Sequence, residues 1–549
     1  MEEVLRKAVQ KALVELGASD TSFVIEWPTD LAHGDFATNA ALAGAKELSK
    51  NPKQLAEEIA GILRESLRQQ VKSVEVAGPG FINFTLAHSV VSGIVSEIPA
   101  LGEQWGKNIS HKGRRVMVEY TDPNPFKEMH IGHLMSNVIG EAVSRLIEND
   151  GAHLARACYQ GDVGPHVAKA LWGLQQKRTT EPATAKELGE AYTHGSQAYE
   201  KNEEVKGEID ALNSALYQGA DTELMELWRK GRDVSLSAFE DIYRILGTKF
   251  DYYFFESETA ALGMELVKEG LAKGIYKESQ GAVIYEGEKK GLHTLVFITS
   301  KGNPTYEAKD VGLAFLKEER WPSDESIIIT ASEQIGHFKV FLASLEDLAP
   351  ALAHKTRHIP HGFLRLTSGK MSSREGSVIT AQSLIQEILE KAEEKNPDPL
   401  IAGQVAIGAI KYMILRSAPG GDIIFDAEKS LALDGDSGPY LQYALVRAKS
   451  LIAQATEPSG ANATPTEPYT LERLLIRFPE VTKMAVVENA PHKVTQYLTQ
   501  LAGEWNSLYG QGKILGADDE KYKLSIARAF STTIENGLRV LGIPTPERM

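Results

Sequence analysis

One stretch, VEYTDPNPFKEMHIGHLMSN at residues 118–137, limits what this chain can fold into more than any other. It begins as an apolar run typical of a buried strand, passes through two prolines and continues with the spacing of an amphipathic helix. Another strand pattern follows at 153–164. Strand, helix and strand in this order predict a parallel βαβ unit, whose ligand crevice lies at the carboxyl ends of the strands. On the helix we expect one buried face, formed by Leu134, Val138, Ile139, Ala142, Val143, Leu146 and Ile147.

The joint between that strand and helix reads His130-Ile131-Gly132-His133. Free backbone N–H groups and the positive end of the helix dipole make such a joint a site for an anion. Gly132 has no Cβ, so a flat base or ribose could lie against the backbone. His130 and His133 could donate hydrogen bonds to phosphate oxygens whose charge grows in a transition state. The alternative is that both histidines only cap or pack the start of the helix.

Bulk properties narrow the class of protein. The chain has 549 residues, too many for one hydrophobic core, so we expect three or more domains. No run of about 18 apolar residues occurs and the N-terminus lacks the layout of a signal peptide, so we expect a cytoplasmic protein with no membrane span. Cys158 is the single cysteine, which excludes an intrachain disulfide and argues against a structural zinc site.

The charge of the chain is unevenly distributed. A net charge of −15, from 59 basic and 74 acidic residues, argues against a protein that coats nucleic acid without selectivity. The segment His354–Arg374, however, carries five lysines and arginines, three histidines and no acidic residue. An anion is the natural partner of such a segment, although a solvated basic surface is the ordinary alternative.

Within that segment, SGKMSSREG at 368–376 is a small Gly- and Ser-rich stretch that carries Lys370, Met371 and Ser372. A loop of this kind can close over a polyphosphate, with the lysine as a point charge and the hydroxyls as donors. Many surface loops have this composition, so alone the signal is weak. Together with His130–His133 in a βαβ context it becomes a strong indication of a nucleotide site.

Composition and pattern divide the chain into four regions. Residues 1–110 combine helical and strand patterns, as in a compact α+β domain. Residues 111–360 hold the βαβ unit and further strands, with a helical, highly charged insertion at about 176–240. Residues 361–430 hold the basic loop and helical segments. Residues 431–549 look all-helical, apart from the Pro- and Ser-rich linker at 456–468. We expect an α/β protein with smaller domains at both ends.

The paired motifs resemble the HIGH and KMSKS signatures of class I aminoacyl-tRNA synthetases, which activate an amino acid with ATP and pass it to the 3′-terminal adenosine of tRNA. Further segments resemble the arginyl-tRNA synthetases in particular, and they stand in that family's order across essentially the whole chain: HGDFATNAAL, GPGFINF, PNPFKEMHIGH, GDVG, FESE, PTYEAKDVG, SEQIGHF, GPYLQYALVRA and GIPTPERM.

The resemblance implies an arginine–tRNA ligase with a Rossmann-type catalytic domain. It implies an N-terminal domain that contacts the tRNA elbow and a C-terminal helical domain that binds the anticodon. L-arginine, ATP and tRNA(Arg) would be the substrates, with Mg²⁺ accompanying ATP, no zinc, and adenylate formation that needs tRNA. We further expect a monomer.

The resemblance also implies roles for individual residues. The catalytic residues would be His130, His133, Lys127 and Lys370. ATP would be bound by His130, Gly132, His133, Lys370, Met371 and Ser372. Arginine would be bound by Asn124, Glu256, Tyr306, Asp310 and Gln334, with the carboxylates on the guanidinium or ammonium group and the tyrosine covering it. The expected tRNA contacts are Phe81, Asn83, Tyr440, Gln442 and Arg447, with Tyr443, Trp505 and Tyr509 as further candidates. For each C-terminal residue, an aromatic ring in the helix core or a solvated charge is an equally strong alternative.

Two positions depart from the family pattern. Val163 in GDVG stands where the family more usually has tryptophan, which puts the local packing in doubt. Ser373 stands where the class signature has its second lysine, and by resemblance Lys127 takes over that charge.

Three alternatives remain open. A class I enzyme for another amino acid is the nearest, and a nucleotidyltransferase with a similar histidine motif is the second. The third is a catalytically impaired relative that still binds tRNA. Intact His130, His133 and Lys370 argue against this last alternative.

Overall fold

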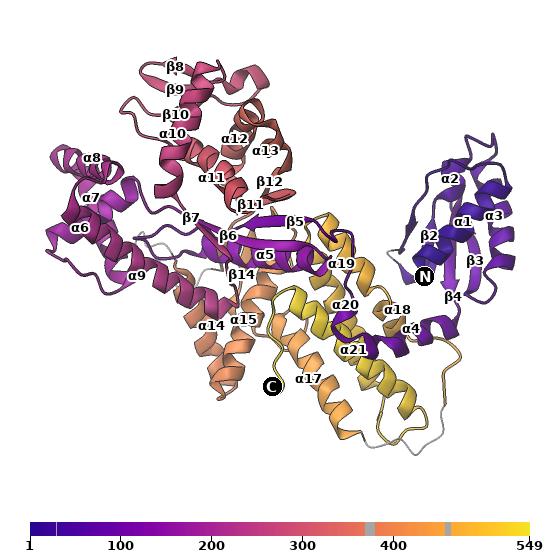
Figure 1. Ribbon diagram of the computed structural model, residues 1–549. Coiled ribbons are helices and arrows are strands. Elements are labelled where there is room, and N and C mark those ends of the chain that lie inside the picture. Colours follow the sequence, from indigo (N-terminus) through magenta and orange to yellow (C-terminus); the bar gives the residue numbers. More distant parts are fainter. Residues whose placement is uncertain (29, 368–378, 456–462) are drawn as a thin grey trace. The chain divides into compact units, whose positions relative to one another are not determined.

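The computed structural model describes residues 1–28, 30–367, 379–455 and 463–549 (Figure 1). The chain forms two compact units. Unit 1 contains residues 1–106, 447–481 and 500–536, and unit 2 contains residues 107–446, 482–499 and 537–549. Each unit is therefore built from segments that lie far apart in the sequence. None of the helices in the described ranges combines the length and apolar character needed to cross a membrane.

A parallel sheet forms the centre of unit 2 (Figure 1). Its order is β12-β11-β5-β6-β7, and all neighbouring strands run parallel. From β5 the next strands along the chain, β6 and β7, extend the sheet to one side, and β11 and β12 extend it to the other. A ligand crevice is expected where the strand order reverses in this way, at the carboxyl end of β5. The α/β class expected from the sequence is confirmed. The strands are β5 (Arg115–Glu119), β6 (His153–Gln160), β7 (Tyr252–Phe255), β11 (Glu325–Ala331) and β12 (Thr356–His361).

Helix α5 (Ile131–Asn149) connects β5 to β6 and confirms the expected βαβ unit. All seven apolar residues of the expected face are buried. The helix begins at Ile131, two residues before His133, because His130 serves as its N-cap. Gly140 also lies on the packed side, since a Cβ there would lie 2.2 Å from the Tyr120 ring.

Four helices stand between β6 and β7, where the sequence indicates a helical insertion. Thr184, Asn202 and Asp221 cap three of them through side-chain oxygens. Gly219 and Gly247 end two of them in the left-handed conformation. Their apolar faces form one buried cluster. The helices are α6 (Pro165–Gln176), α7 (Ala185–Lys201), α8 (Glu203–Gln218) and α9 (Thr222–Leu246).

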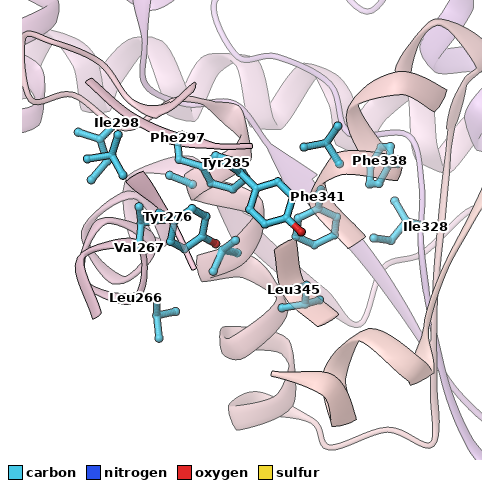
Figure 2. Close-up of a cluster of buried hydrophobic side chains, with 14 residues drawn as sticks. Leu266, Val267, Tyr276, Tyr285, Phe297, Ile298, Ile328, Phe338, Phe341 and Leu345 are labelled. Carbon is cyan, nitrogen blue, oxygen red and sulfur yellow. The ribbon is translucent and has the colours of Figure 1, made fainter. Parts of the chain in front are cut away.

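A small antiparallel sheet with the order β10-β9-β8 packs on helices α10 to α13. Figure 2 shows the buried side chains that join them, among them Tyr276, Phe297 and Phe341. Gly263 allows α10 to touch α11, because a Cβ there would lie 1.9 Å from the Ala308 carbonyl oxygen. The elements are α10 (Glu256–Ala272), β8 (Lys277–Ser279), β9 (Ala282–Tyr285), η3 (Gly287–Lys290), β10 (Leu295–Ile298), α11 (Tyr306–Arg320), η4 (Ser332–Gln334), α12 (Ile335–Leu348) and α13 (Pro350–Lys355).

The region after the parallel sheet is mostly helical, with one short pair of parallel strands. In α15, the fully buried Lys411 donates hydrogen bonds of 2.6 Å to the carbonyl oxygens of Leu246 and Gly542. This lysine therefore ties the ends of two distant helices to α15. The elements are β13 (Leu364–Leu366), α14 (Ala381–Lys395), α15 (Pro399–Leu415), β14 (Ile423–Phe425), α16 (Ala427–Ser430) and α17 (Gly438–Gln454).

The remainder of the chain is helical in its described residues, as the sequence indicates. The helices are α18 (Thr470–Leu475), α19 (Phe478–Val487), α20 (Pro491–Gly510) and α21 (Glu520–Val540).

Unit 1 contains an antiparallel sheet of order β1-β2-β4-β3. In β4, Ile82, Phe84 and Leu86 are buried, whereas Phe81 and Asn83 point to the opposite, half-buried face. This alternation is the one expected for a sheet with one face on the core. The elements are α1 (Glu2–Glu15), β1 (Ile25–Glu26), η1 (Leu31–His33), β2 (Phe36–Thr38), α2 (Ala40–Gly44), α3 (Pro52–Ser66), β3 (Val71–Ala77), β4 (Phe81–Leu86), α4 (His88–Leu101) and η2 (Gly102–Gln104).

Candidate active site

The carboxyl edge of the parallel sheet carries most of the expected site residues. Asn124 lies in the loop after β5, Glu256 directly follows β7, and Gln334 follows β11 in η4. Because the carboxyl ends of parallel strands meet at one edge, these positions share one rim of the sheet. The structure therefore brings residues from distant parts of the chain to one edge of the sheet.

The two motif histidines cap the start of α5. Nδ1 of His130 accepts a hydrogen bond of 3.1 Å from the Gly132 backbone, and Nδ1 of His133 accepts one of 3.3 Å from the His130 backbone. The two rings stack with their centroids 3.7 Å apart. A Cβ on Gly132 would lie 2.8 Å from the His130 ring, so this glycine allows the stack to form. Capping by these histidines, one alternative from the sequence, is thus part of the structure.

Capping also determines which nitrogen of each ring carries a proton. Burial and the nearby charge of Lys127 lower the pKa of His130, and burial together with His130 and Lys127 lowers the pKa of His133 well below its usual range. Both rings are therefore neutral near pH 7. Since Nδ1 accepts, Nε2 carries the hydrogen in each ring and can donate. Capping and donation to a phosphate are compatible roles.

Residues 379–381 are joined to the histidine motif. The Ile131 backbone donates to the Ile379 carbonyl at 3.2 Å, and the Ala381 backbone donates to the Met129 carbonyl at 2.7 Å. His130 and Thr380 form an antiparallel bridge. Lys370, Met371, Ser372 and Ser373 lie outside the described residues.

In the loop between β5 and α5, three residues that are not glycine adopt a positive φ angle, which strains the backbone. Thr121, Asp122 and Phe126 have φ angles of 79°, 47° and 65°. Each is held by a hydrogen bond: Ser136 accepts from the Thr121 backbone, Asp122 accepts from the Tyr159 backbone, and Ser235 accepts from the Phe126 backbone. Strained residues held in this way are typical of functional sites. The loop that carries Asn124 is therefore fixed by its surroundings.

The first carboxylate of the expected arginine site is already paired. Oε2 of Glu256 lies 2.5 Å from Nζ of Lys309, and both side chains are more than 90% buried. Nζ lies 4.9 Å from the centroid of the Tyr306 ring and 5.9 Å from that of Tyr217. Burial alone would lower the pKa of Lys309, but the Glu256 carboxylate outweighs burial and raises it. A carboxylate and tyrosine rings thus surround an ammonium ion here.

The second carboxylate, Asp310, is paired with a histidine that was not expected at the site. Nε2 of His337 lies 2.5 Å from Oδ2 of Asp310, and its Nδ1 lies 3.4 Å from Oε1 of Glu307. Burial acts to lower the pKa of His337, but its bonds to Asp310 and Glu307 prevail and raise it to about 10. His337 is therefore an imidazolium near pH 7. Both nitrogens then donate to carboxylates of α11.

A glycine separates two of the expected arginine ligands. A Cβ on Gly161 would lie 2.5 Å from Oδ1 of Asn124 and 3.3 Å from Oε1 of Glu256. The neighbouring Asp162 is fully buried and accepts hydrogen bonds of 2.8 and 2.7 Å from the backbone and hydroxyl of Ser257. The GDVG segment therefore leaves space beside Asn124 and Glu256 and holds the start of α10.

Comparison with known proteins decides the family. Residues 95–427 match the family model described as tRNA synthetases class I (R), catalytic domain. Residues 2–86 match the arginyl-tRNA synthetase N-terminal domain, and residues 441–549 match the DALR anticodon-binding domain. The chain belongs to the arginyl-tRNA synthetases. The class I catalytic fold, with its N-terminal domain and its C-terminal helical domain, agrees with the expectation from the sequence.

Individual relatives agree with this assignment. Arginine–tRNA ligases of Treponema denticola and Clostridium perfringens are each 29% identical to the chain. They cover 96% and 98% of it, and the chain covers 94% and 98% of theirs. The arginyl-tRNA synthetase structure of Thermus thermophilus matches with a TM-score of 0.82 at 27% identity, over the full length of both chains. The chain is therefore an arginine–tRNA ligase, and nothing in these relatives supports the impaired alternative.

The helical insertion of the synthetase supplies aromatic residues that the sequence analysis missed. Tyr192 on α7 lies 4.3 Å from Nζ of Lys127, measured to the ring centroid, and Tyr217 on α8 lies near Lys309. No local pattern in the sequence marks these tyrosines, because only the tertiary fold brings the insertion helices to the site. Gly161, His337 and Lys309 stand inside or beside quoted family segments, but their contacts were not foreseen.

The expected tRNA contacts of the synthetase differ in exposure. Phe81 and Asn83 are half-buried on one face of β4, and Tyr440 is half-buried on α17. Nη1 of Arg447 donates to Asn506 at 3.0 Å, and its guanidinium lies 4.0 Å from the centroid of the Tyr509 ring.

Gln442 and Trp505 were expected wrongly as tRNA contacts. Gln442 is fully buried and donates to the carbonyl oxygens of Gln404 and Pro544. Trp505 is fully buried and stacks on Phe530. Both side chains belong to the core, where RNA does not reach.

The basic segment also differs in part from its expected role. Lys355 pairs with Glu318, Arg357 with Glu325 and Arg365 with Asp422. Carboxylates of the protein thus already partner the described lysine and arginines of the segment. For residues 368–374 of the segment, which lie outside the described residues, binding of an external anion stays a prediction.

Proposed function

We propose that the neutral Nε2–H groups of His130 and His133 bind phosphate oxygens of ATP, while Gly132 leaves room for the nucleotide. The observation that supports this role is the capping geometry, in which Nδ1 of each ring faces the helix and Nε2 is the donor. The positive charge of Lys127 acts on both rings and helps to lower their pKa values. Lys370, Met371 and Ser372 stay a prediction from the sequence.

Arginine would bind across the carboxyl edge of the sheet. Glu256 and Asp310 would accept hydrogen bonds from the guanidinium, Tyr306 would cover it, and Asn124 and Gln334 would hold the α-amino and carboxyl ends. Tyr306 is 56% exposed, so its ring is accessible to a ligand. Oε1 of Glu256 and Oδ1 of Asn124 both face the open side of Gly161, which supports a shared contact there.

The reaction would then follow from position and charge. A carboxylate oxygen of arginine attacks the α-phosphorus of ATP in line, and the bond to pyrophosphate breaks, which yields arginyl-adenylate. Donors at His130 and His133 would stabilise the charge that develops on the phosphate oxygens. The 2′-hydroxyl of the terminal adenosine would next attack the carbonyl carbon, and AMP would leave.

Mg²⁺ would enter with ATP. In the described ranges no three His, Cys, Asp or Glu side chains gather in a way that could hold a metal ion. Mg²⁺ keeps several waters and binds readily to substrate phosphates, so the triphosphate itself would supply most of its ligands. The ion would neutralise charge on the leaving pyrophosphate.

We further propose that Phe81 and Asn83 contact the tRNA elbow, and that Tyr440, Tyr443, Arg447 and Tyr509 face the anticodon loop. Single-stranded bases are read by stacking on aromatic rings and by contacts to base edges. We assign these roles to regions 1–110 and 431–549, catalysis to 111–360 and stem contacts to 361–430. The protein would act as a monomer in the cytoplasm.

One assay tests the site. ATP–pyrophosphate exchange is measured with each amino acid, with and without tRNA(Arg), for the wild type and for Glu256→Gln and Asp310→Asn. We expect exchange with arginine alone, only when tRNA is present, and a KM for arginine at least about tenfold higher in both variants. Exchange with another amino acid, or unchanged KM values, would overturn the assignment of the pocket.

A further inference from the structure

Each carboxylate of the proposed arginine site holds a cation of the protein. Glu256 pairs with Lys309, and Asp310 pairs with His337, which also contacts Glu307. Two cations of the protein therefore already face the three carboxylates of this region. The site is thus not a general trap for positive charge. Which cation it accepts must depend on shape and on the positions that remain open.

The position of Lys309 suits an ammonium ion. Its Nζ lies 2.5 Å from Oε2 of Glu256, close to the rings of Tyr306 and Tyr217, and the side chain is 4% exposed. A carboxylate together with aromatic faces attracts a compact cation. A lysine or ornithine substrate would need this same position, but Lys309 already fills it.

We propose that Lys309 is a specificity-determining residue, whose ammonium occupies the place beside Glu256 that an amino-alkyl substrate would require and so reserves the site for a guanidinium. The inference rests on the proposed arginine site. It adds that the enzyme rejects lysine and ornithine by occupying their subsite with a group of its own.

A guanidinium can bind the carboxylate oxygens that Lys309 does not contact. Its planar fork carries five N–H donors and spreads its charge, so it can reach Oε1 of Glu256 and the free oxygen of Asp310 without entering the ammonium position. Glu256 and Asp310 stand on the two helices α10 and α11, which touch at Gly263 and Ala308. A compact ammonium is more strongly hydrated and cannot span two acids. The ammonium group of lysine or ornithine would also lie next to the positive charge of Lys309, and this repulsion disfavours their binding.

The test uses the full-length enzyme with tRNA(Arg) and compares the wild type with Lys309→Met. The KM for arginine and the inhibition constants of L-lysine and L-ornithine against arginine are measured by aminoacylation. In K309M we expect the ratio of the lysine inhibition constant to the arginine KM to fall at least about tenfold. Lys169→Met is the matched control, because Nζ of Lys169 likewise lies near a tyrosine ring, 4.5 Å from that of Tyr199, but outside the site. Its ratio should not change.

A second variant covers the case in which K309M does not fold. Lys309→Arg keeps the buried charge, but its fork can take both oxygens of Glu256 and so withdraw Oε1 from the substrate. We expect K309R to fold and to raise the KM for arginine about tenfold, with kcat changed less. If the ion pair between Lys309 and Glu256 only stabilises the fold, the K309R substitution should leave the KM for the substrate arginine unchanged.

The outcomes separate this inference from the proposed site. Unchanged KM values for arginine in Glu256→Gln and Asp310→Asn would refute the site and the inference together. Raised KM values in those variants, combined with an unchanged lysine-to-arginine ratio in K309M or an unchanged KM in K309R, would refute the role of Lys309 alone.

Discussion

Nε2 of His337 lies 2.5 Å from Oδ2 of Asp310, which places a half-buried imidazolium against a carboxylate that we propose as a substrate ligand. The histidine comes from α12 and the aspartate from α11, so the bond links two helices as well as two charges. It also fixes one oxygen of Asp310 and leaves the other for a ligand.

This pair predicts a pH-dependent stability. The pKa of His337 is raised from an ordinary value near 6.5 to about 10, so its contribution is complete below about pH 6.5 and is lost as the pH rises to about 10. We expect His337→Gln to lower the stability by a few kcal/mol at pH 6, with the difference shrinking toward pH 10. Melting temperatures of both proteins from pH 6 to 10.5 would show this convergence. A constant difference would contradict the assigned charge.

Gly161→Ala should weaken arginine binding without unfolding the enzyme. The new Cβ would lie 2.5 Å from Oδ1 of Asn124, so that side chain must move away from its proposed contact. We expect the KM for arginine to rise about tenfold, with the KM for ATP changed less. Gly207→Ala on α8 is the control, because nothing lies within 4 Å of a Cβ there. Equal effects in both variants would argue against the proposed contact.

Two substitutions of His133 separate capping from phosphate binding. Asparagine can place an oxygen near the position of Nδ1 and keep the cap, whereas glutamine can place a donor near Nε2 but loses the cap. If the donor matters, His133→Asn should fold normally yet lose pyrophosphate exchange about a hundredfold. His133→Gln should retain more exchange and melt at a lower temperature. The reverse pattern would show that the ring only caps the helix.

Lys411 predicts a second dependence of stability on pH, with the opposite sign. Burial and the nearby Arg145 lower the pKa of Lys411 to about 7, whereas the unfolded chain titrates near 10.5. The unfolded state therefore binds more protons between these values, and the contribution of Lys411 to stability grows with pH across this window. We expect the melting temperature of Lys411→Met to fall progressively further below that of the wild type between pH 7 and 10. A gap that narrows over this range would contradict the assignment.

Local patterns in the sequence were sufficient for much of the fold. The period of residues 131–149 and the apolar runs at β5, β6 and β11 are set by near neighbours, so the βαβ unit could be predicted. The short strands β13 and β14 escaped notice because three residues carry little pattern. Further strands were expected within residues 111–360, but nothing local shows that β9 and β10 form a separate antiparallel sheet.

The contacts within the site were harder to foresee. Glu256 and Lys309 are 53 positions apart, and only the packing of α10 on α11 makes them partners. The burial of Gln442 and Trp505 depends in the same way on helices that arrive from elsewhere. Resemblance to the family could name candidate residues, but it could not show which carboxylates are already paired with a cationic side chain of the protein.

The tyrosines of the insertion have a consequence for the modular design of the enzyme. Tyr192 and Tyr217 stand on helices inserted between two strands of the sheet, yet their ring centroids lie 4.3 Å from Nζ of Lys127 and 5.9 Å from Nζ of Lys309. A shortened version cut back to the bare nucleotide fold could keep both histidines but would leave these cations without their aromatic neighbours. The segment between β6 and β7 thus contributes side chains to the proposed site. We expect a variant without this segment to lose activity even where the nucleotide-binding fold is kept.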